Sequence, residues 1–190
     1  MTVRIKNMRE VLLLAGISEI NTHGVTGFSI RRVAAACNVS CAAPYKHFKD
    51  KKEFIASIIE YVNEQWASRQ KEILAECGTT LREQIVEVCC GYVRFLMEKP
   101  YFRSILMLKD EEFDNIYHKK RGEMSSRSQK LELDFFEASG FSHEVFKRKF
   151  HLVRAMIFGT IFMMDSGELA YNDETMNNFR YCIDREFDIL

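Results

Sequence analysis

Apolar residues recur along most of this chain at the three- and four-residue intervals of an α-helix. Ile5, Met8, Leu12 and Ala15 show the pattern near the start, and the low proline content, two residues in 190, also favours helix. The spacing predicts an all-α fold of about nine helices, over roughly residues 4–21, 30–36, 41–48, 50–75, 80–99, 101–108, 124–139, 142–166 and 175–187.

Several of these helices carry recognisable start and stop signals. Asp50 with Glu53, and Thr80 with Glu83, have the three-residue spacing of a capping box, in which each side chain satisfies a backbone N–H group. Pro100 cannot continue a helix and ends the one that Thr80 begins. The boundaries at residues 50 and 80 are therefore predicted by local chemistry as well as by periodicity.

The stretch from Ser29 to Phe54 predicts a helix-turn-helix. Ser29 can cap a helix whose apolar face contains Ile30 and Val33. A turn follows at residues 37–40, where Asn38 tolerates the left-handed backbone conformation of a helix stop. With the first helix, these elements predict a small three-helix bundle.

The helix predicted over residues 41–48 has the shape of a DNA-reading element, because its first residues are small and its later ones polar. Ser40 can cap it and Phe48 can anchor it in the core. Pro44 is expected to make its start irregular, since proline lacks a backbone donor.

The formal net charge of zero conceals an uneven distribution. Nine Lys and Arg residues and three acidic residues lie between residues 1 and 52, which gives +6 there and −6 over the remainder. A basic head on an acidic body suits a protein that presents one end to a polyanion. The longest apolar run, residues 155–164, is too short to span a membrane, and no secretory leader pattern is present, so we expect a cytoplasmic protein without membrane contact.

The residues that most often carry chemistry show no catalytic or metal-binding pattern. The six cysteines include no C-x-x-C pair, and the five histidines are scattered, so we expect no enzyme activity, metal or cofactor. Most cysteines are predicted to be buried apolar residues. The alternative is a thiol sensor built on Cys37 and Cys41.

The head segment resembles the DNA-binding domain of the TetR family of bacterial transcription regulators over roughly residues 4–59. The matching residues are Ser29, Val39, Ser40, Tyr45, His47, Phe48, Lys51 and Glu53. Cys37 and Asn38 stand where that family usually has alanine and glycine, and Cys41 replaces a frequent basic residue. The resemblance implies a DNA-binding domain at residues 1–50 and a regulatory domain for ligand binding and dimerisation at residues 51–190.

Two sources give the candidate DNA-binding residues. The resemblance implies that Ser29, Tyr45 and Lys49 contact phosphates and that Lys51 lies near the same strand. The residues themselves point to Cys41, Ala42, Ala43 and Lys46 in the groove and to Arg31 and Arg32 in either role. His47 is equally compatible with local packing. The full set is Ser29, Arg31, Arg32, Ser40, Cys41, Ala42, Ala43, Tyr45, Lys46, His47, Lys49 and Lys51.

The body offers candidates for an effector pocket and for a dimer interface. Aromatic and methionine side chains suit an apolar ligand, although at helical spacing they are equally compatible with plain core: Trp66, Tyr92, Phe95, Met107, Phe136, Phe158 and Met163. A single head reads few base pairs, so we expect a homodimer on a palindromic operator, joined through the last two long helices. The candidate interface residues are Val153, Ile157, Ile161, Met164, Phe179 and Ile183, with intramolecular core as the alternative.

Taken together, the sequence and its resemblance predict a dimeric transcriptional regulator that an unidentified small-molecule effector releases from double-stranded operator DNA. The resemblance implies a repressor, which is the most frequent role in that family. The alternatives are a transcriptional activator and a helical protein that binds small molecules or lipids.

Overall fold

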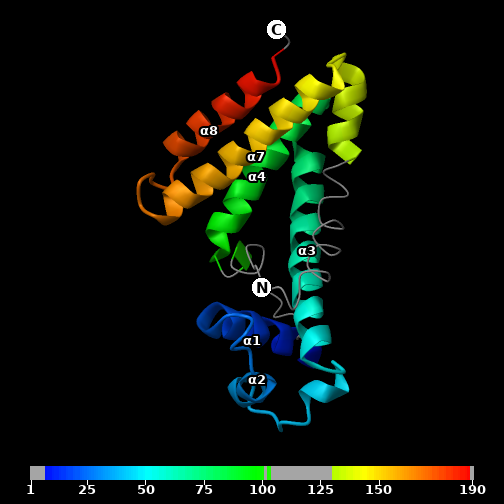
Figure 1. The fold of residues 1–190 in the computed structure, drawn as a ribbon, viewed down its shortest axis with the longest axis vertical. Helices are drawn as coiled ribbons and strands as arrows, with labels where there is room; N and C mark the ends of the chain where they lie inside the picture. Colours follow the sequence, from blue (N-terminus) through cyan, green and yellow to red (C-terminus); the bar gives the residue numbers. More distant parts are fainter. Residues whose placement is uncertain (1–6, 101, 104–129, 189–190) are drawn as a thin grey trace. The chain divides into compact units, whose positions relative to one another are not determined.

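A computed structural model describes residues 7–100, 102–103 and 130–188. Its elements, in chain order, are α1 (Met8–His23), α2 (Ile30–Ala36), the short 3₁₀ helix η1 (Pro44–Lys46), α3 (Lys51–Glu76), α4 (Leu81–Glu98), α7 (His143–Asp165) and α8 (Asp173–Glu186) (Figure 1). Residues 130–139 are helical as well, and the described ranges contain no strand. The all-α prediction is therefore confirmed.

Within the described ranges the structure gives six α-helices and one 3₁₀ helix as bounded elements, against roughly nine predicted helices. Most of the helix predicted at residues 101–108 lies outside the described residues, although 102–103 are helical. The helix predicted at 124–139 is described only from residue 130. None of the helices in the described ranges has the length and apolar content that a bilayer crossing requires.

The chain divides into two compact units, and the boundary falls between Gln65 and Trp66, inside α3. The first unit, called the head, includes α1, α2, η1 and the start of α3. The second unit, called the body, includes the end of α3, then α4, residues 130–139, α7 and α8. The assignment of DNA binding to residues 1–50 and regulation to 51–190 stays a prediction.

The head encloses an aromatic core. The rings of Phe48 and Phe54 stack with their centroids 4.0 Å apart, and Phe28 meets Phe54 edge-on at 5.4 Å. Gly16 lets α1 approach α3 closely, since a Cβ atom there would lie 2.7 Å from the Cδ1 atom of Ile58. Phe48 is thereby anchored against Phe54 at the start of α3.

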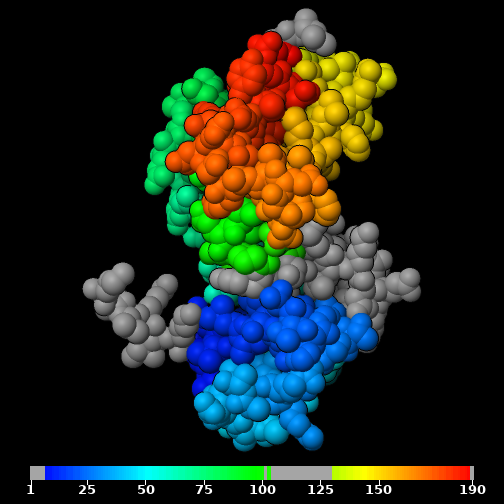
Figure 2. All heavy atoms as spheres, turned by 90° about the vertical axis from the view of Figure 1, so that its left-hand side faces the viewer, coloured from blue at the N-terminus to red at the C-terminus, as the bar shows by residue number. Residues whose placement is uncertain are grey.

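The body is built from helices with strong caps. Thr80 and Glu83 form the predicted capping box at the start of α4, and the side chain of Ser142 accepts a hydrogen bond from the backbone N–H of Val145 at the start of α7. α4 packs against both α7 and α8, and α7 packs against α8. On the face drawn in Figure 2, α8 (red) lies beside the C-terminal part of α7 (orange).

Candidate nucleic-acid interface

α2 begins and ends as the sequence predicts. The side chain of Ser29 accepts a hydrogen bond from the backbone N–H of Arg32 at 3.4 Å, which caps the helix. At the other end, the N–H of Asn38 donates to the carbonyl of Ala35 and that of Val39 to the carbonyl of Ala34, both at 3.0 Å. This pair of bonds is a Schellman motif, which places a left-handed residue directly after the helix.

Asn38 is the left-handed residue, with a φ of 53°. Asparagine tolerates this conformation better than most residues because its short polar side chain relieves part of the cost. The turn predicted at residues 37–40 is therefore present, although asparagine occupies the position where the resembling family uses glycine.

The prediction of an α-helix over residues 41–48 is wrong. Only η1, Pro44–Lys46, is helical there, and it is a 3₁₀ helix. The N–H of Ala43 donates to the carbonyl of Ser40 at 2.9 Å and that of Lys46 to the carbonyl of Ala43 at 3.2 Å, both three residues apart. Pro44 is buried and has no N–H, so the four-residue bond to Ser40 that would continue an α-helix cannot form. The sequence predicted an irregular start, but the irregularity extends over the whole segment.

The segment nevertheless presents small and polar groups to solvent. Tyr45 is 57 % exposed. Ser40, Cys41, Ala42, Lys46 and Lys49 are exposed as well, whereas Ala43 and His47 are half-buried. Phe48 is buried on the opposite side, so the segment has one anchored edge and one free edge.

Arg32 is held within the head, and its assignment as a DNA contact stays a prediction. Its Nε atom donates to Oε1 of Glu19 at 2.8 Å, and its terminal NH2 group donates to the same carboxylate and to the carbonyl of Gly27. Glu19 also accepts from the backbone N–H of Ser29 at 3.2 Å, and its side chain is only 9 % exposed. Arg32 and Glu19 therefore fix the entry of α2 against α1, and nothing in the sequence periodicity pointed to this pair.

Lys51 and its neighbours fix the start of α3. The Nζ atom of Lys51 donates to the carbonyl of Thr26 at 3.2 Å. Oδ1 of Asp50 accepts from the N–H of Glu53 at 2.8 Å, and Oε2 of Glu53 accepts from the N–H of Lys49 at 2.7 Å. The predicted capping arrangement is present, with the Glu53 carboxylate reaching one residue further back than the cap. One of the three donors of Lys51 is already in use, so its role is at least partly structural.

Three further cations of the head, Arg31, Lys46 and Lys49, are exposed. No carboxylate of the described residues lies within ion-pair distance of Arg31, Lys46 or Lys49. Arg9, which the sequence reasoning missed, lies with its guanidinium 5.5 Å from the ring centroid of Phe48 and so adds a cation beside the same segment. The sequence feature that could have identified Arg9 is its position as a basic residue in the first turn of a helix. These four residues make this part of the head a basic surface.

The cysteine pair in this region differs in environment. Cys37 is half-buried, and burial raises the pKa of its thiol, while Cys41 is exposed. A raised pKa lowers the thiolate fraction and hence the reactivity of Cys37. The proposal of a thiol sensor stays a prediction. Among the described residues, no group of three His, Cys, Asp or Glu side chains could hold a metal ion.

The predicted effector-binding residues fall into separate environments. Trp66 is buried and meets the rings of Tyr92 and Phe95 at 4.8 and 5.4 Å. Phe136 packs on Phe146 at 4.6 Å. Phe158 and Met163 are 36 % and 37 % exposed, and Met107 lies outside the described residues. Among the described candidates, the structure therefore joins Trp66, Tyr92 and Phe95 in one cluster.

The predicted dimer-interface residues are buried inside the single chain. Their exposure is 8 % or less in each case: Val153, Ile157, Ile161, Met164, Phe179 and Ile183. This burial favours the intramolecular alternative, and their assignment to a dimer interface stays a prediction. The sequence reasoning missed a second apolar face of the same helices, which includes Leu152, Phe158, Phe162 and Met163 on α7 and Tyr181 on α8. The sequence feature that could have revealed this face is a second set of apolar residues at helical spacing on α7.

Comparisons with known proteins agree with this geometry. The family described as bacterial regulatory proteins, tetR family, matches residues 12–58. No curated protein matches the chain. A TetR family transcription regulator from Marinobacter aquaeolei VT8 is similar in structure, with a TM-score of 0.77 at 21 % identity over 94 % of both chains.

Two further solved structures share the fold. The TetR family transcriptional regulator PfmR from Thermus thermophilus has a TM-score of 0.68 at 16 % identity, over 98 % of both chains. A TetR variant from Acinetobacter baumannii AYE, in complex with minocycline, has a TM-score of 0.57 at 17 % identity over 96 % of this chain and 95 % of that one. Residues 12–58 therefore match the TetR family of bacterial regulatory proteins, and nearly the whole chain has the fold of solved TetR family regulators.

Proposed function

We propose that this protein is a cytoplasmic, dimeric transcriptional repressor that binds a palindromic operator through its head and is released by a small-molecule effector. The observation that carries the DNA-binding part is the anchored segment after Asn38. It exposes Cys41, Ala42, Tyr45 and Lys46 on one side while Phe48 holds the other in the core.

The chemistry of this surface suits a duplex. Lys49 and Arg31 can neutralise phosphates, and the Tyr45 hydroxyl can donate to a phosphate oxygen. Lys46 can donate to guanine O6 and N7, and the small side chains of Cys41 and Ala42 allow close approach to base edges. Because η1 has only three residues, we expect the base contacts to be few and the phosphate contacts to supply most of the affinity.

The dimer proposal rests on the exposed face of α7. Phe162 is 67 % exposed, and Leu152, Phe158 and Met163 of the same helix are exposed as well. A Cβ atom added to Gly159, in the middle of this face, would meet no atom within 4 Å in the single chain. A contiguous exposed apolar surface of this kind marks a protein interface. A second copy of the chain, packed on α7 and α8, would place two heads on one duplex.

The effector part of the proposal is supported by one similar protein and by an aromatic cluster of the body. The similar Acinetobacter baumannii protein holds minocycline, and in this chain three of the candidate ligand residues, Trp66, Tyr92 and Phe95, form one aromatic cluster. By linkage, an effector that weakens DNA binding by a given factor must bind the DNA-free protein more tightly than the DNA-bound protein by the same factor.

The test is a Tyr45→Ala, Lys49→Ala double variant. Both residues are exposed, so the variant should keep the circular dichroism spectrum and melting temperature of the wild type. We expect it to bind a duplex selected from random sequence at least roughly 30-fold more weakly, because two interactions with phosphate are removed. Fluorescence anisotropy at fixed salt gives the measurement.

Lys71→Ala is the matched control, because Lys71 is an exposed lysine of the body. It should bind the same duplex as the wild type does. A folded double variant with unchanged affinity would show that the segment after Asn38 is not the reading element. A wild type that selects no sequence at all would remove the regulator proposal.

A further inference from the structure

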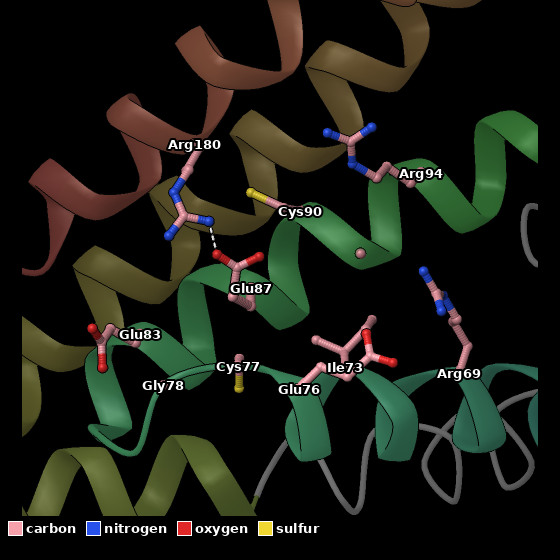
Figure 3. A pocket seen from close by; sticks show the side chains of 11 residues that line it. Arg69, Ile73, Glu76, Cys77, Gly78, Glu83, Glu87, Cys90, Arg94 and Arg180 are labelled. Carbon is pink, nitrogen blue, oxygen red and sulfur yellow. Dashed lines mark ion pairs between the residues drawn. The ribbon is translucent and has the colours of Figure 1, made fainter. Parts of the chain in front are cut away.

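The body contains a pocket that none of the candidate ligand residues lines. It has a volume of about 390 Å³ and lies between the C-terminal turns of α3, one face of α4 and Arg180 of α8 (Figure 3). Arg69, Ile73, Glu76 and Cys77 come from the end of α3 and the residue after it, spaced along one side of the helix. Every residue of its wall belongs to the body unit.

The floor of this pocket is apolar and uncharged. Ile73 lies against Gly91 so closely that a Cβ atom there would be 2.2 Å from Ile73 Cδ1. Cys90 is 6 % exposed, and burial raises the pKa of its thiol to about 11, so the group is neutral at physiological pH. A ligand that covers this floor must therefore bring apolar surface.

The wall carries guanidinium groups from three different helices. Arg180 makes an ion pair with Glu87 of α4, drawn as a dashed line in Figure 3. Arg69 contacts Glu72 at 3.1 Å, and Arg94 lies 3.9 Å from Asp173. Neither Glu72 nor Asp173 lines the pocket, and their side chains are 56 % and 93 % exposed. Exposed pairs of this kind contribute about 0–1 kcal/mol, so a better anion can replace them.

The carboxylates of the wall are mostly engaged elsewhere. Oε2 of Glu83 accepts from the Thr80 hydroxyl at 2.7 Å and from the Thr80 N–H at 3.3 Å, as part of the helix cap. Glu87 is paired with Arg180. Arg69 and Arg94 are paired only with residues outside the pocket lining. Among the described residues that line the pocket, Glu76 is the one carboxylate that binds neither a helix cap nor an arginine of the wall.

We propose that this pocket binds a small organic anion, such as an aromatic carboxylate, whose apolar body lies over Ile73 and Cys90 and whose charged group lies between Arg69 and Arg94. Arginine is suited to this role because its planar fork matches a carboxylate in two-point contact. The proposal goes beyond the proposed function and concerns a location other than the Trp66 cluster. It is tested without DNA, so its failure and that of the regulator proposal are separate results.

The experiment compares three probes with one apolar body: 2-naphthoate, 2-naphthalenemethanol and 2-naphthylmethylammonium. Isothermal titration of the full-length protein should show 2-naphthoate binding at least about tenfold more tightly than either of the others. In the Arg69→Gln, Arg94→Gln double variant this preference should fall to within roughly twofold, while the alcohol binds as before. Equal binding of the three probes to the wild type, or a preference retained by the folded variant, would overturn the proposal.

Two additional measurements locate the site. Arg148→Gln is the matched control, because Arg148 is an exposed arginine of α7 that pairs with Glu144 and lines no part of the pocket. It should keep the full preference for 2-naphthoate. In the wild type, the Cδ1 methyl NMR signal of Ile73 should shift on binding and that of Ile183 should not. A titration that shifts Ile183 and leaves Ile73 unchanged would place the anion elsewhere, even if the double variant did not fold.

Discussion

The head and the body differ in the side chains that they expose to solvent on the sides of their elements that are not buried. In the head, the side chains opposite Phe48 are small, polar or basic, and Tyr45 is the one large apolar group exposed in that segment. In the body, α7 buries Val153, Ile157 and Ile161 on one side and exposes Phe158 and Phe162 on another. Helical periodicity accounts for one apolar face per helix, and the exposed apolar residues of α7 lie outside that buried face.

The comparison indicates two kinds of recognition in one chain. The head presents charge and hydrogen-bond donors, which suit a polyanion whose binding weakens as salt rises. The body presents exposed apolar area, whose association depends on the hydrophobic effect and is much less sensitive to salt. Five predictions test or sharpen this division, starting with the one of largest effect.

Replacing Phe162 by glutamate should break self-association. Phe162 is 67 % exposed, so the fold of the single chain should be unaffected, whereas a charge buried between two copies is costly. We expect the dimer dissociation constant to rise at least roughly 100-fold, measured by sedimentation equilibrium. Lys71→Glu, at an exposed position of α3, should leave the constant within about threefold.

Gly159 sharpens the same test. Gly159→Ala should stabilise an isolated chain by up to about 1 kcal/mol, because alanine favours helix and the added Cβ meets open space. If a second α7 packs closely at this point, the same change should weaken the dimer. A variant that is more stable and associates as the wild type does would place the interface elsewhere.

Arg32→Gln should destabilise the head. The change removes the guanidinium from Glu19, whose side chain is only 9 % exposed, and from the carbonyl of Gly27. Since Arg32 itself is half exposed, we expect a loss of about 1–2 kcal/mol in the free energy of unfolding, measured with urea.

The adjacent Arg31→Gln is the control for this substitution. Arg31 is exposed and has no acidic partner among the described residues. The Arg31→Gln variant should therefore be as stable as the wild type but bind DNA more weakly. Equal stability of the two variants would contradict the structural role of Arg32.

Lys46→Gln and Lys49→Gln test which cations of the head bind phosphate. Removing one lysine–phosphate interaction should reduce the slope of log affinity against log salt by about 0.9. We expect this for Lys49, and a smaller change in slope with relaxed sequence preference for Lys46. Lys71→Gln should leave the slope unchanged. Identical slopes for all three variants would remove the basic head surface from the DNA complex.

Glu132→Gln should have the smallest effect, and its sign depends on pH. Burial raises the pKa of Glu132, and Arg154, whose guanidinium lies 3.7 Å away, opposes this only in part. For an acid with a raised folded-state pKa, the stabilising contribution is complete at low pH and is lost as pH rises through that pKa. At pH 7 the variant should therefore be more stable, by less than about 1 kcal/mol, and near pH 4 it should equal the wild type.

Thermal melts at both pH values give the Glu132 comparison. A variant that is less stable than the wild type at pH 7 would mean that the ion pair with Arg154 outweighs the burial of the carboxylate.

Features that depend on a few neighbouring residues were predictable from the sequence. Ser29 and Asp50 begin helices because their side-chain oxygens lie next to the N–H groups that need an acceptor. Asn38 ends α2 because its own backbone tolerates the left-handed conformation. The all-α class and the basic head follow from composition and spacing in the same way.

Only the tertiary structure decided which groups meet across the chain. Arg32 is a positioning residue because Glu19 lies opposite it, thirteen positions earlier in the sequence. Ile157 and Ile161 are core because α4 and α8 cover that side of α7, and periodicity alone does not say which of two apolar faces is covered. Pro44 shortens a predicted α-helix to one 3₁₀ turn. Caps and turns are fixed by atoms a few bonds away, whereas burial, ion pairs and pockets depend on surfaces that fold together from distant parts of the chain.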